Sequence, residues 1–157
     1  MTNYWLCKQE PTSYDFSHLE REGKTIWDGV HNALALKHLR SMRSGDLAFF
    51  YESGKVRSIV GVMRVLSDPR PDPRDPTSFV VEMGSVRRLS HPVPLKLVKA
   101  NPKFKGFALV RLSRLSVMPV PKNVWNALLE LERVHLEGTS GNVKSRSPDR
   151  KDKVFEP

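Results

Sequence analysis

The six residues from Trp27 to Asn32 carry an unusual set of groups: an indole, a carboxylate, a glycine, an imidazole and an amide. The indole of Trp27 can stack on a nucleobase, which contributes about 1–3 kcal/mol per base contact. The amide of Asn32 can both donate to and accept from the edge of a base. Gly29 lets the backbone approach a ring because it has no Cβ atom. These groups predict a site for a flat heterocycle, whereas a buried tryptophan beside helix-capping residues explains only Trp27 and one polar neighbour.

A second ring and further hydroxyl groups lie elsewhere in the chain. Tyr51 and Ser53 end an apolar stretch. The phenol ring of Tyr51 can provide a second stacking face. The hydroxyl groups of Ser53 and Ser116 can each donate or accept a hydrogen bond. An ordinary turn beside an exposed aromatic residue is the alternative interpretation of Tyr51 and Ser53. The helix expected to begin near Asn32 adds free backbone N–H groups, which favour a phosphate or carbonyl oxygen.

The excess of positive charge is confined to one segment of this 157-residue chain, whose formal net charge is +9. Residues 1–82 carry eleven Lys and Arg against eleven Asp and Glu, and residues 130–157 carry six against six. Residues 83–129 contain no acidic residue and nine basic ones: Arg87, Arg88, Lys96, Lys99, Lys103, Lys105, Arg111, Arg114 and Lys122. We expect these nine to contact the backbone of a nucleic acid, because each neutralised phosphate releases counterions. The alternative is a solvated basic face that aids solubility.

Motifs for catalysis, cofactors and metals are missing from the sequence. Gly23-Lys24-Thr25 resembles the end of a phosphate-binding loop, but the glycine required five positions earlier is His18. The chain has no dinucleotide fingerprint, no nucleophile elbow and no C-x-x-C pair. Its five histidines include no pair three or four residues apart, the spacing of a helical metal site. The sequence therefore predicts no catalytic residue, no cofactor and no metal.

Length and composition predict one domain. A hydrophobic content of 39% is enough for a single core. We expect the domain to occupy residues 1–137 and residues 138–157 to form a loosely ordered tail. The single cysteine, Cys7, fits a reducing compartment and predicts a cytoplasmic location. No apolar run approaches the length of a membrane span, and no heptad seam predicts a coiled-coil dimer, so we expect a monomer away from membranes.

The elements that must position these residues are both helical and extended. Residues 3–8 are predicted to form a strand, and residues 32–42 a helix, since Leu36, Leu39 and Met42 follow its spacing. Between them, a short helix is expected to be capped by Ser13 and ended by Gly23. Apolar runs on either side of residues 53–55 predict a β-hairpin.

The second half of the chain continues this mixture. The proline-rich residues 68–76 exclude helix and sheet and predict an extended, solvated loop, in which Asp68, Asp72 and Asp75 are structural turn residues. Residues 78–89 and 109–120 are predicted to be strands, and residues 94–100 one or two helical turns. A closing helix is expected to begin at Pro121. The fold class is therefore α+β.

Several blocks of the sequence, taken together and in order, resemble the EVE domain. The resemblance covers about residues 3–130, and its specific parts are the Y-W-L-x-K-x-E-P and W-D-G-V blocks. The matching blocks are YWLCKQEPTSYDF (4–16), WDGVHNALALKHLRSMRSGD (27–46), FFYESGK (49–55), IVGVMRV (59–65), PDP (71–73) and RLSVMPV (114–120), followed by Trp125.

The resemblance implies a PUA-like fold, a curved β-barrel of about five to six strands flanked by helices and related to YTH domains. It also implies a non-catalytic reader that accommodates a flipped, modified base of DNA or RNA in an aromatic pocket. The pocket is expected to include Lys8, Trp27, Gly29, Val30, His31, Asn32, Tyr51, Ser53, Ser116, Met118 and Pro119. Two positions depart from the family pattern: His31 replaces a frequent arginine, and Glu52 replaces a frequent histidine.

Other functions remain open from the residues alone. Lys8, Glu10, Glu52 and His31 could serve as acid and base groups of an RNA-processing enzyme. A pocket of this size would also accept a free nucleoside, as in a small-molecule sensor. The third alternative is an adaptor that binds another protein.

Overall fold

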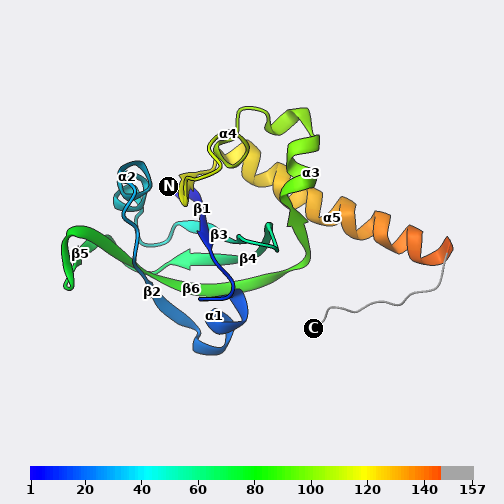
Figure 1. Ribbon diagram of the computed structural model, residues 1–157. Coiled ribbons are helices and arrows are strands. Elements are labelled where there is room, and N and C mark those ends of the chain that lie inside the picture. Colours follow the sequence, from blue (N-terminus) through cyan, green and yellow to red (C-terminus); the bar gives the residue numbers. More distant parts are fainter. Residues whose placement is uncertain (146–157) are drawn as a thin grey trace.

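The computed structural model describes residues 1–145, and of residues 134–145 it describes only the backbone. The bounds of the strands and helices are β1 (Tyr4–Gln9), α1 (Phe16–Glu22), β2 (Lys24–Trp27), α2 (Ala33–Ser41), β3 (Leu47–Glu52), β4 (Ser58–Val65), β5 (Arg70–Asp72), β6 (Asp75–Pro94), α3 (Leu95–Ala100), the 3-10 turn η1 (Pro102–Phe104), α4 (Ala108–Arg111), β7 (Val117–Pro119) and α5 (Lys122–Ser145). Strands and helices alternate up to α2, and four consecutive strands and then three consecutive helical elements follow before β7 and α5 (Figure 1).

Within the described residues, the strands form one curved sheet of seven strands in the order β2-β6-β4-β3-β1-β7, with β5 added to β6. The α+β class and the curved sheet flanked by helices are confirmed, but the sheet has seven strands, not five to six, and is not closed into a barrel, because β2 and β7 stand at opposite ends and do not pair. Helix α2 packs against both β6 and β7, and so bridges the open side of the sheet.

Strand β1 links the two halves of the chain. It pairs in parallel with β3, so that Lys8 lies opposite Tyr51, and antiparallel with β7, so that Leu6 lies opposite Met118. The long strand β6 pairs with β2, β4 and β5, and its register against β4 shifts twice, which bends the sheet. This connectivity brings the ends of β1 and β3 and the start of β7 together.

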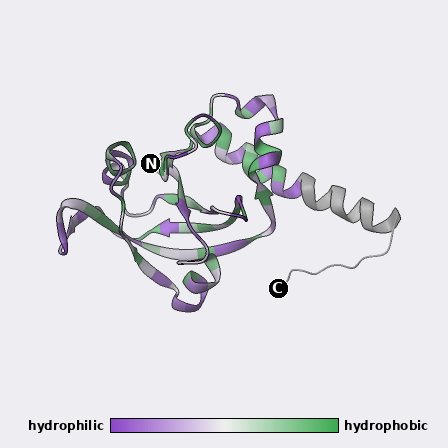
Figure 2. Ribbon diagram, viewed as in Figure 1, coloured by the Kyte–Doolittle hydropathy of each residue, from purple (hydrophilic) through white to green (hydrophobic). Residues whose placement is uncertain are grey.

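The core lies against both faces of the central strands. Phe49 stacks on Trp125 of α5, with ring centroids 3.9 Å apart, and Phe50 meets Phe16 of α1 edge-on at 5.2 Å. A Cβ atom on Gly61 would lie 2.3 Å from the ring of Phe16, so glycine is required for this close approach. Hydrophilic colouring is prominent around α1 and at the β5–β6 turn (Figure 2).

The proline-rich segment, residues 68–76, does not form the extended, solvated loop that the sequence predicts. Residues 70–72 and 75–94 are strands that pair with each other. Strand β5 lies off the main path of the sheet, where prolines do not remove hydrogen bonds needed by a second neighbour. The structural interpretation of the aspartates is confirmed: Asp68, Asp72 and Asp75 accept hydrogen bonds from the backbone N–H groups of Ser44, Arg74 and Thr77.

Other element predictions are confirmed or corrected locally. Helix α2 has the predicted position, and so do β1 and the helical turns of α3. Helix α1 is capped by Asp15, not Ser13, in a capping box with His18. Residues 109–120 are not one strand, because helix α4 and a turn at Leu112 precede the short β7.

The last described helix crosses the expected boundary between domain and tail, and that boundary stays a prediction. The backbone of α5 stays helical to Ser145, beyond the predicted domain end at residue 137. The remainder of the predicted tail, residues 146–157, lies outside the described residues. No helix among those described is both long and apolar enough to span a bilayer.

Candidate nucleic-acid interface

The Trp27 to Asn32 turn connects the end of β2 to the start of α2. Gly29 has a φ of +73°, a conformation that side-chain-bearing residues adopt only with strain. Asn32 is the N-cap of α2, and its Oδ1 accepts a hydrogen bond from the backbone N–H of Ala35 at 2.9 Å. The acceptor of the predicted base reader is therefore engaged in the helix cap, although Asn32 itself is exposed.

The same turn is fastened to the β5–β6 hairpin. Three contacts join them: Arg74 Nη2 to Asp28 Oδ2 at 2.8 Å, the Ser78 hydroxyl donating to the Val30 carbonyl at 2.9 Å, and His31 Nδ1 to Asp75 Oδ2 at 3.7 Å. The first and third contacts are solvent-exposed, whereas the second is buried. Two hydrogen bonds from Thr77, with a smaller electrostatic effect of the nearby His31, hold the pKa of Asp75 below its ordinary value. The hairpin missed in the sequence therefore positions the predicted site.

Trp27 is a core residue in this structure. It is 2% exposed and meets the ring of Phe50 edge-on, with centroids 5.6 Å apart and ring planes at 88°. The expectation of a stacking face open to solvent is therefore not met. The physical reason is that β2 pairs with β6 up to Trp27, opposite Val81, which turns the indole inward against β3.

Tyr51 lies in a second group, at the ends of β1 and β3. It is 2% exposed, and Nζ of Lys8 lies 5.5 Å from its ring centroid. Nζ of Lys8 also donates to the Ser113 carbonyl at 2.9 Å, and the Lys8 N–H donates to the Ser116 carbonyl at 2.9 Å. Burial lowers the pKa of Lys8; it raises the pKa of Tyr51, against a smaller opposing effect of Arg57.

The two rings do not face each other. The ring contact of Trp27 is with Phe50, and Tyr51 is the next residue along β3, whose side chain leaves the opposite face of the strand. The structure thus brings Lys8, Tyr51 and Ser116 together, but places Trp27 in a separate group. The prediction of one hollow walled by both rings does not fit this arrangement.

The remaining predicted pocket residues have mixed surroundings. The hydroxyl of Ser53 donates to the Gln9 carbonyl at 3.1 Å. Met118 is fully buried, and Pro119 is exposed on β7 opposite Trp5. Met118 is therefore a core residue, and of the two only Pro119 is accessible from solvent.

The acid and base groups of the alternative enzyme are dispersed among different partners. Oε2 of Glu52 accepts a hydrogen bond from the backbone N–H of Phe16 at 2.9 Å, at the start of α1. Nζ of Lys8 is bound to Ser113, and His31 stands beside Asp75. Over the part of the chain that the structure describes, no cluster of three or more His, Cys, Asp or Glu has the arrangement of a metal site.

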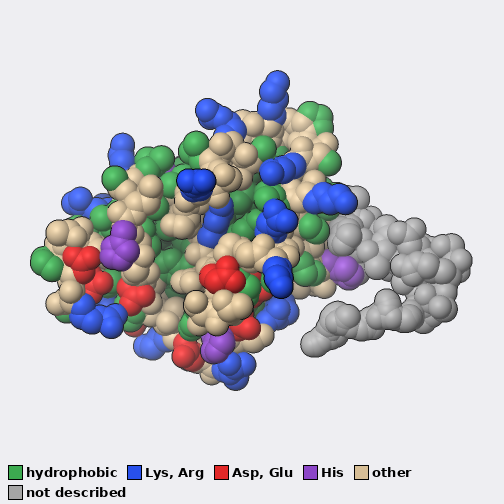
Figure 3. Space-filling view, viewed as in Figure 1, with side chains coloured by type: hydrophobic (Ala, Val, Ile, Leu, Met, Phe, Trp, Pro, Cys, Tyr) green, Lys and Arg blue, Asp and Glu red, His purple; other side chains and the backbone are tan. Residues whose placement is uncertain are grey.

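The nine predicted backbone contacts divide into two groups. Arg87 binds Glu132 through two hydrogen bonds of 3.1 Å, and Arg88 binds Glu20 at 2.7 Å. The other seven are exposed and make no ion pair with the described residues; we call them the basic surface: Lys96, Lys99, Lys103, Lys105, Arg111, Arg114 and Lys122. Blue side chains gather over the upper part of Figure 3, where Figure 1 places α3 and α4.

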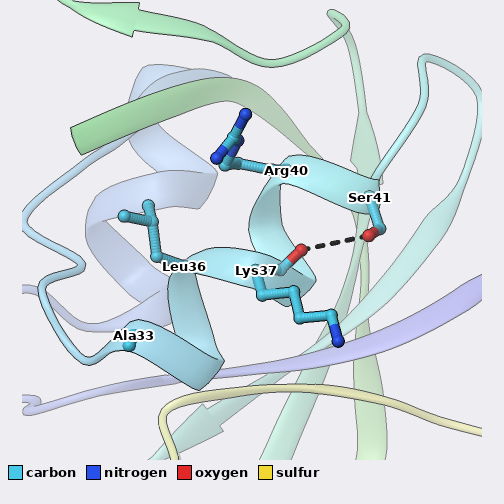
Figure 4. Close-up of a pocket in the computed structure, with 5 residues that line it drawn as sticks. All are labelled: Ala33, Leu36, Lys37, Arg40 and Ser41. Carbon is cyan, nitrogen blue, oxygen red and sulfur yellow. Dashed lines mark hydrogen bonds between the residues drawn. The ribbon is translucent and has the colours of Figure 1, made fainter. Parts of the chain in front are cut away.

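The structure also shows two features that the sequence analysis did not predict. An open hollow of about 390 Å³ lies at α2 and is lined by Ala33, Leu36, Lys37, Arg40 and Ser41 (Figure 4). Arg40 lies over the ring of Phe79 at 4.3 Å, and Lys37 points to another side of the helix. The second feature is Arg57, whose charge acts on Tyr51. Only its position in the turn after Gly54 could have indicated it.

Comparison with known proteins decides the family. The sequence profile of the EVE domain matches residues 3–131. The chain belongs to the EVE domain family. Mouse thymocyte nuclear protein 1 is similar to this EVE protein, with 31% identity covering 84% of this chain and 74% of the mouse protein.

Solved structures agree with this EVE assignment. Rpa0253 from Rhodopseudomonas palustris superposes with a TM-score of 0.81 and 34% identity, over 85% of this chain and 94% of the other. Human THYN1, solved in complex with DNA containing 5-methylcytosine, superposes with a TM-score of 0.78 and 26% identity, over 83% and 98% of the two chains. The family resemblance inferred from the sequence blocks is confirmed.

Proposed function

We propose that this EVE protein is a non-catalytic reader that binds nucleic acid carrying a modified base. The observation that carries the proposal is the likeness to human THYN1, a protein solved with DNA that contains 5-methylcytosine. The basic surface supports it, because seven exposed and unpaired cations attract a polyanion. Glu52, Lys8 and His31 each engage a different partner, which favours binding over catalysis.

The base has to reach an aromatic face that is closed in this structure. Access would require movement of the Trp27 to Asn32 turn, which would break the Arg74 to Asp28 ion pair between side chains that are 79% and 40% exposed. Exposed ion pairs of this kind contribute about 0–1 kcal/mol, so breaking one costs little. The buried hydrogen bond from Ser78 to Val30 would remain as the point about which the turn moves. An extruded base then gains a stacking contact in exchange for the one it loses.

The experiment measures affinity for two short DNA duplexes that differ in one 5-methylcytosine. Wild type is expected to bind the methylated duplex more tightly. Trp27→Phe keeps a buried aromatic ring but reduces the stacking area, so it should lose part of this preference while its affinity for the unmethylated duplex stays the same.

The matched control is Trp125→Phe, which changes another buried indole, 5% exposed, that stacks on Phe49 on the other side of β3. It should keep the preference for the methylated duplex. Equal affinity of wild type for the two duplexes would refute methylcytosine reading, and equal losses in both variants would refute the role of Trp27.

A further inference from the structure

Arg57 has an unusual backbone conformation. It is the non-glycine residue with positive φ, at 45°, in the part of the chain that the structure describes. It follows Gly54, which has a φ of 67°, in the turn between β3 and β4. Glycine adopts this region without strain, whereas arginine does not. A strained residue at a turn suggests a function for its side chain.

The backbone of Arg57 is held in place while its side chain is not. Its carbonyl accepts a hydrogen bond from the N–H of Leu95 at 2.9 Å, and the Ser58 hydroxyl donates to the Val56 carbonyl at 3.0 Å. The residue is exposed, and its guanidinium forms no ion pair or hydrogen bond with any residue described here. A rigid anchor thus presents a charge that no neighbouring carboxylate neutralises.

Arg57 lies between the basic surface and the pair formed by Lys8 and Tyr51. Its charge acts on the Tyr51 phenol, which Lys8 approaches at 5.5 Å. The hydrogen bond to Leu95 ties the turn to the first residue of α3, which carries Lys96 and Lys99 of the basic surface. Arg57 therefore extends that surface toward the end of β3 with a cation from outside the basic segment.

We infer that Arg57 binds a backbone phosphate of the nucleic acid where the strand passes from the basic surface to the Lys8–Tyr51 group. The guanidinium can make two parallel hydrogen bonds to phosphate oxygens. The inference rests on the proposed function, because it names a contact of the same nucleic-acid ligand. Binding through phosphate is independent of base modification, so Arg57 contributes affinity without methylcytosine preference.

The test uses two substitutions at one position. Arg57→Gly removes the charge and relieves the backbone, so its unfolding midpoint in urea should equal or exceed that of wild type. Its affinity for both the methylated and the unmethylated duplex should fall about tenfold at about 50 mM salt, and the slope of log affinity against log salt should decrease by about 0.9. Arg57→Lys keeps the charge and should retain most of the slope.

The outcomes separate this inference from the proposed function. If wild type prefers the methylated duplex while Arg57→Gly keeps wild-type affinity and slope, the inference is wrong and the reader remains. A loss confined to the methylated duplex would also overturn it, since that places Arg57 at the base. If wild type binds neither duplex, both the inference about Arg57 and the proposed function are wrong.

Discussion

The backbone N–H of Phe16 donates a hydrogen bond to Oε2 of Glu52 at 2.9 Å, which joins the first residue of α1 to the last residue of β3. Phe16 is fully buried against Gly61 and Phe50. The residue that departs from the family's frequent histidine therefore has a structural partner. A carboxylate at the start of a helix also complements the helix dipole.

Two substitutions of Glu52 should lower the free energy of unfolding by different amounts. Glu52→Ala is expected to reduce the free energy of unfolding by about 0.5–2 kcal/mol, because a helix-terminal N–H loses its acceptor. Glu52→Gln keeps an oxygen acceptor and should cost less, about 0.3–1 kcal/mol for the lost charge. Urea denaturation measures both. Glu130→Ala, an exposed residue of α5, is the control and should stay within about 0.5 kcal/mol of wild type; a Glu52→Ala protein as stable as wild type would contradict the contact.

Removing the Trp27 ring should destabilise the fold and not merely weaken binding. The indole is 2% exposed against Phe50, so Trp27→Ala is expected to cost about 3–5 kcal/mol of unfolding free energy. Trp27→Phe should retain most of this stability, which is why it serves as the binding variant. Thermal or chemical denaturation of the pair checks the difference. Wild-type stability of Trp27→Ala would show that the ring is not packed as the structure places it.

The pair formed by Glu132 and Arg87 should make stability depend on pH. Burial acts to raise the pKa of Glu132, but the Arg87 guanidinium and the Ser90 N–H outweigh it and hold the pKa below its ordinary value. Because the folded-state pKa is depressed, the stabilisation is present above the unfolded value of about 4.3 and is lost as pH falls through the folded value.

The comparison is between wild type and Glu132→Gln. At pH 7 the variant should be less stable by about 1–3 kcal/mol, since Arg87 loses a charged partner. The gap should narrow when denaturation is repeated at pH values below the ordinary carboxyl pKa. A gap that is constant with pH would mean that the Glu132 charge does not stabilise the fold.

The two groups of basic residues should respond differently to substitution. Lys103→Ala removes an exposed, unpaired cation and should weaken DNA binding at low salt, with a salt slope reduced by about 0.9 and unchanged stability. Arg87→Ala should instead lower stability, because Glu132 stays buried without its partner. Salt titrations and urea denaturation of both variants give the contrast. Equal salt slopes for Lys103→Ala and wild type would exclude Lys103 from the interface.

Local patterns explain what the sequence could predict. Helix α2 follows from the spacing of Leu36 and Leu39 together with its Asn32 cap, all within eleven residues. The basic surface follows from composition alone. What composition does not reveal is pairing: Arg87 and Arg88 are neutralised by Glu132 and Glu20, which lie 45 and 68 residues away along the chain.

The missed features depend on tertiary neighbours in the same way. Prolines exclude a central strand but not an edge strand, so β5 could not be inferred without knowing its place in the sheet. The same holds for Trp27, because only the pairing of β2 with β6 shows that its ring points into the core. The family resemblance supplied the order of the blocks, but not which face of β3 each ring occupies.

The position of β1 between β3 and β7 has a consequence for synthesis on the ribosome. The third residue of β1, Leu6, leaves the exit tunnel early, yet its partner Met118 is among the last sheet residues to be made. Until then one edge of a largely apolar strand has no hydrogen-bonded neighbour and can pair with another nascent chain. Slowing translation between β6 and β7 should therefore favour aggregation during expression.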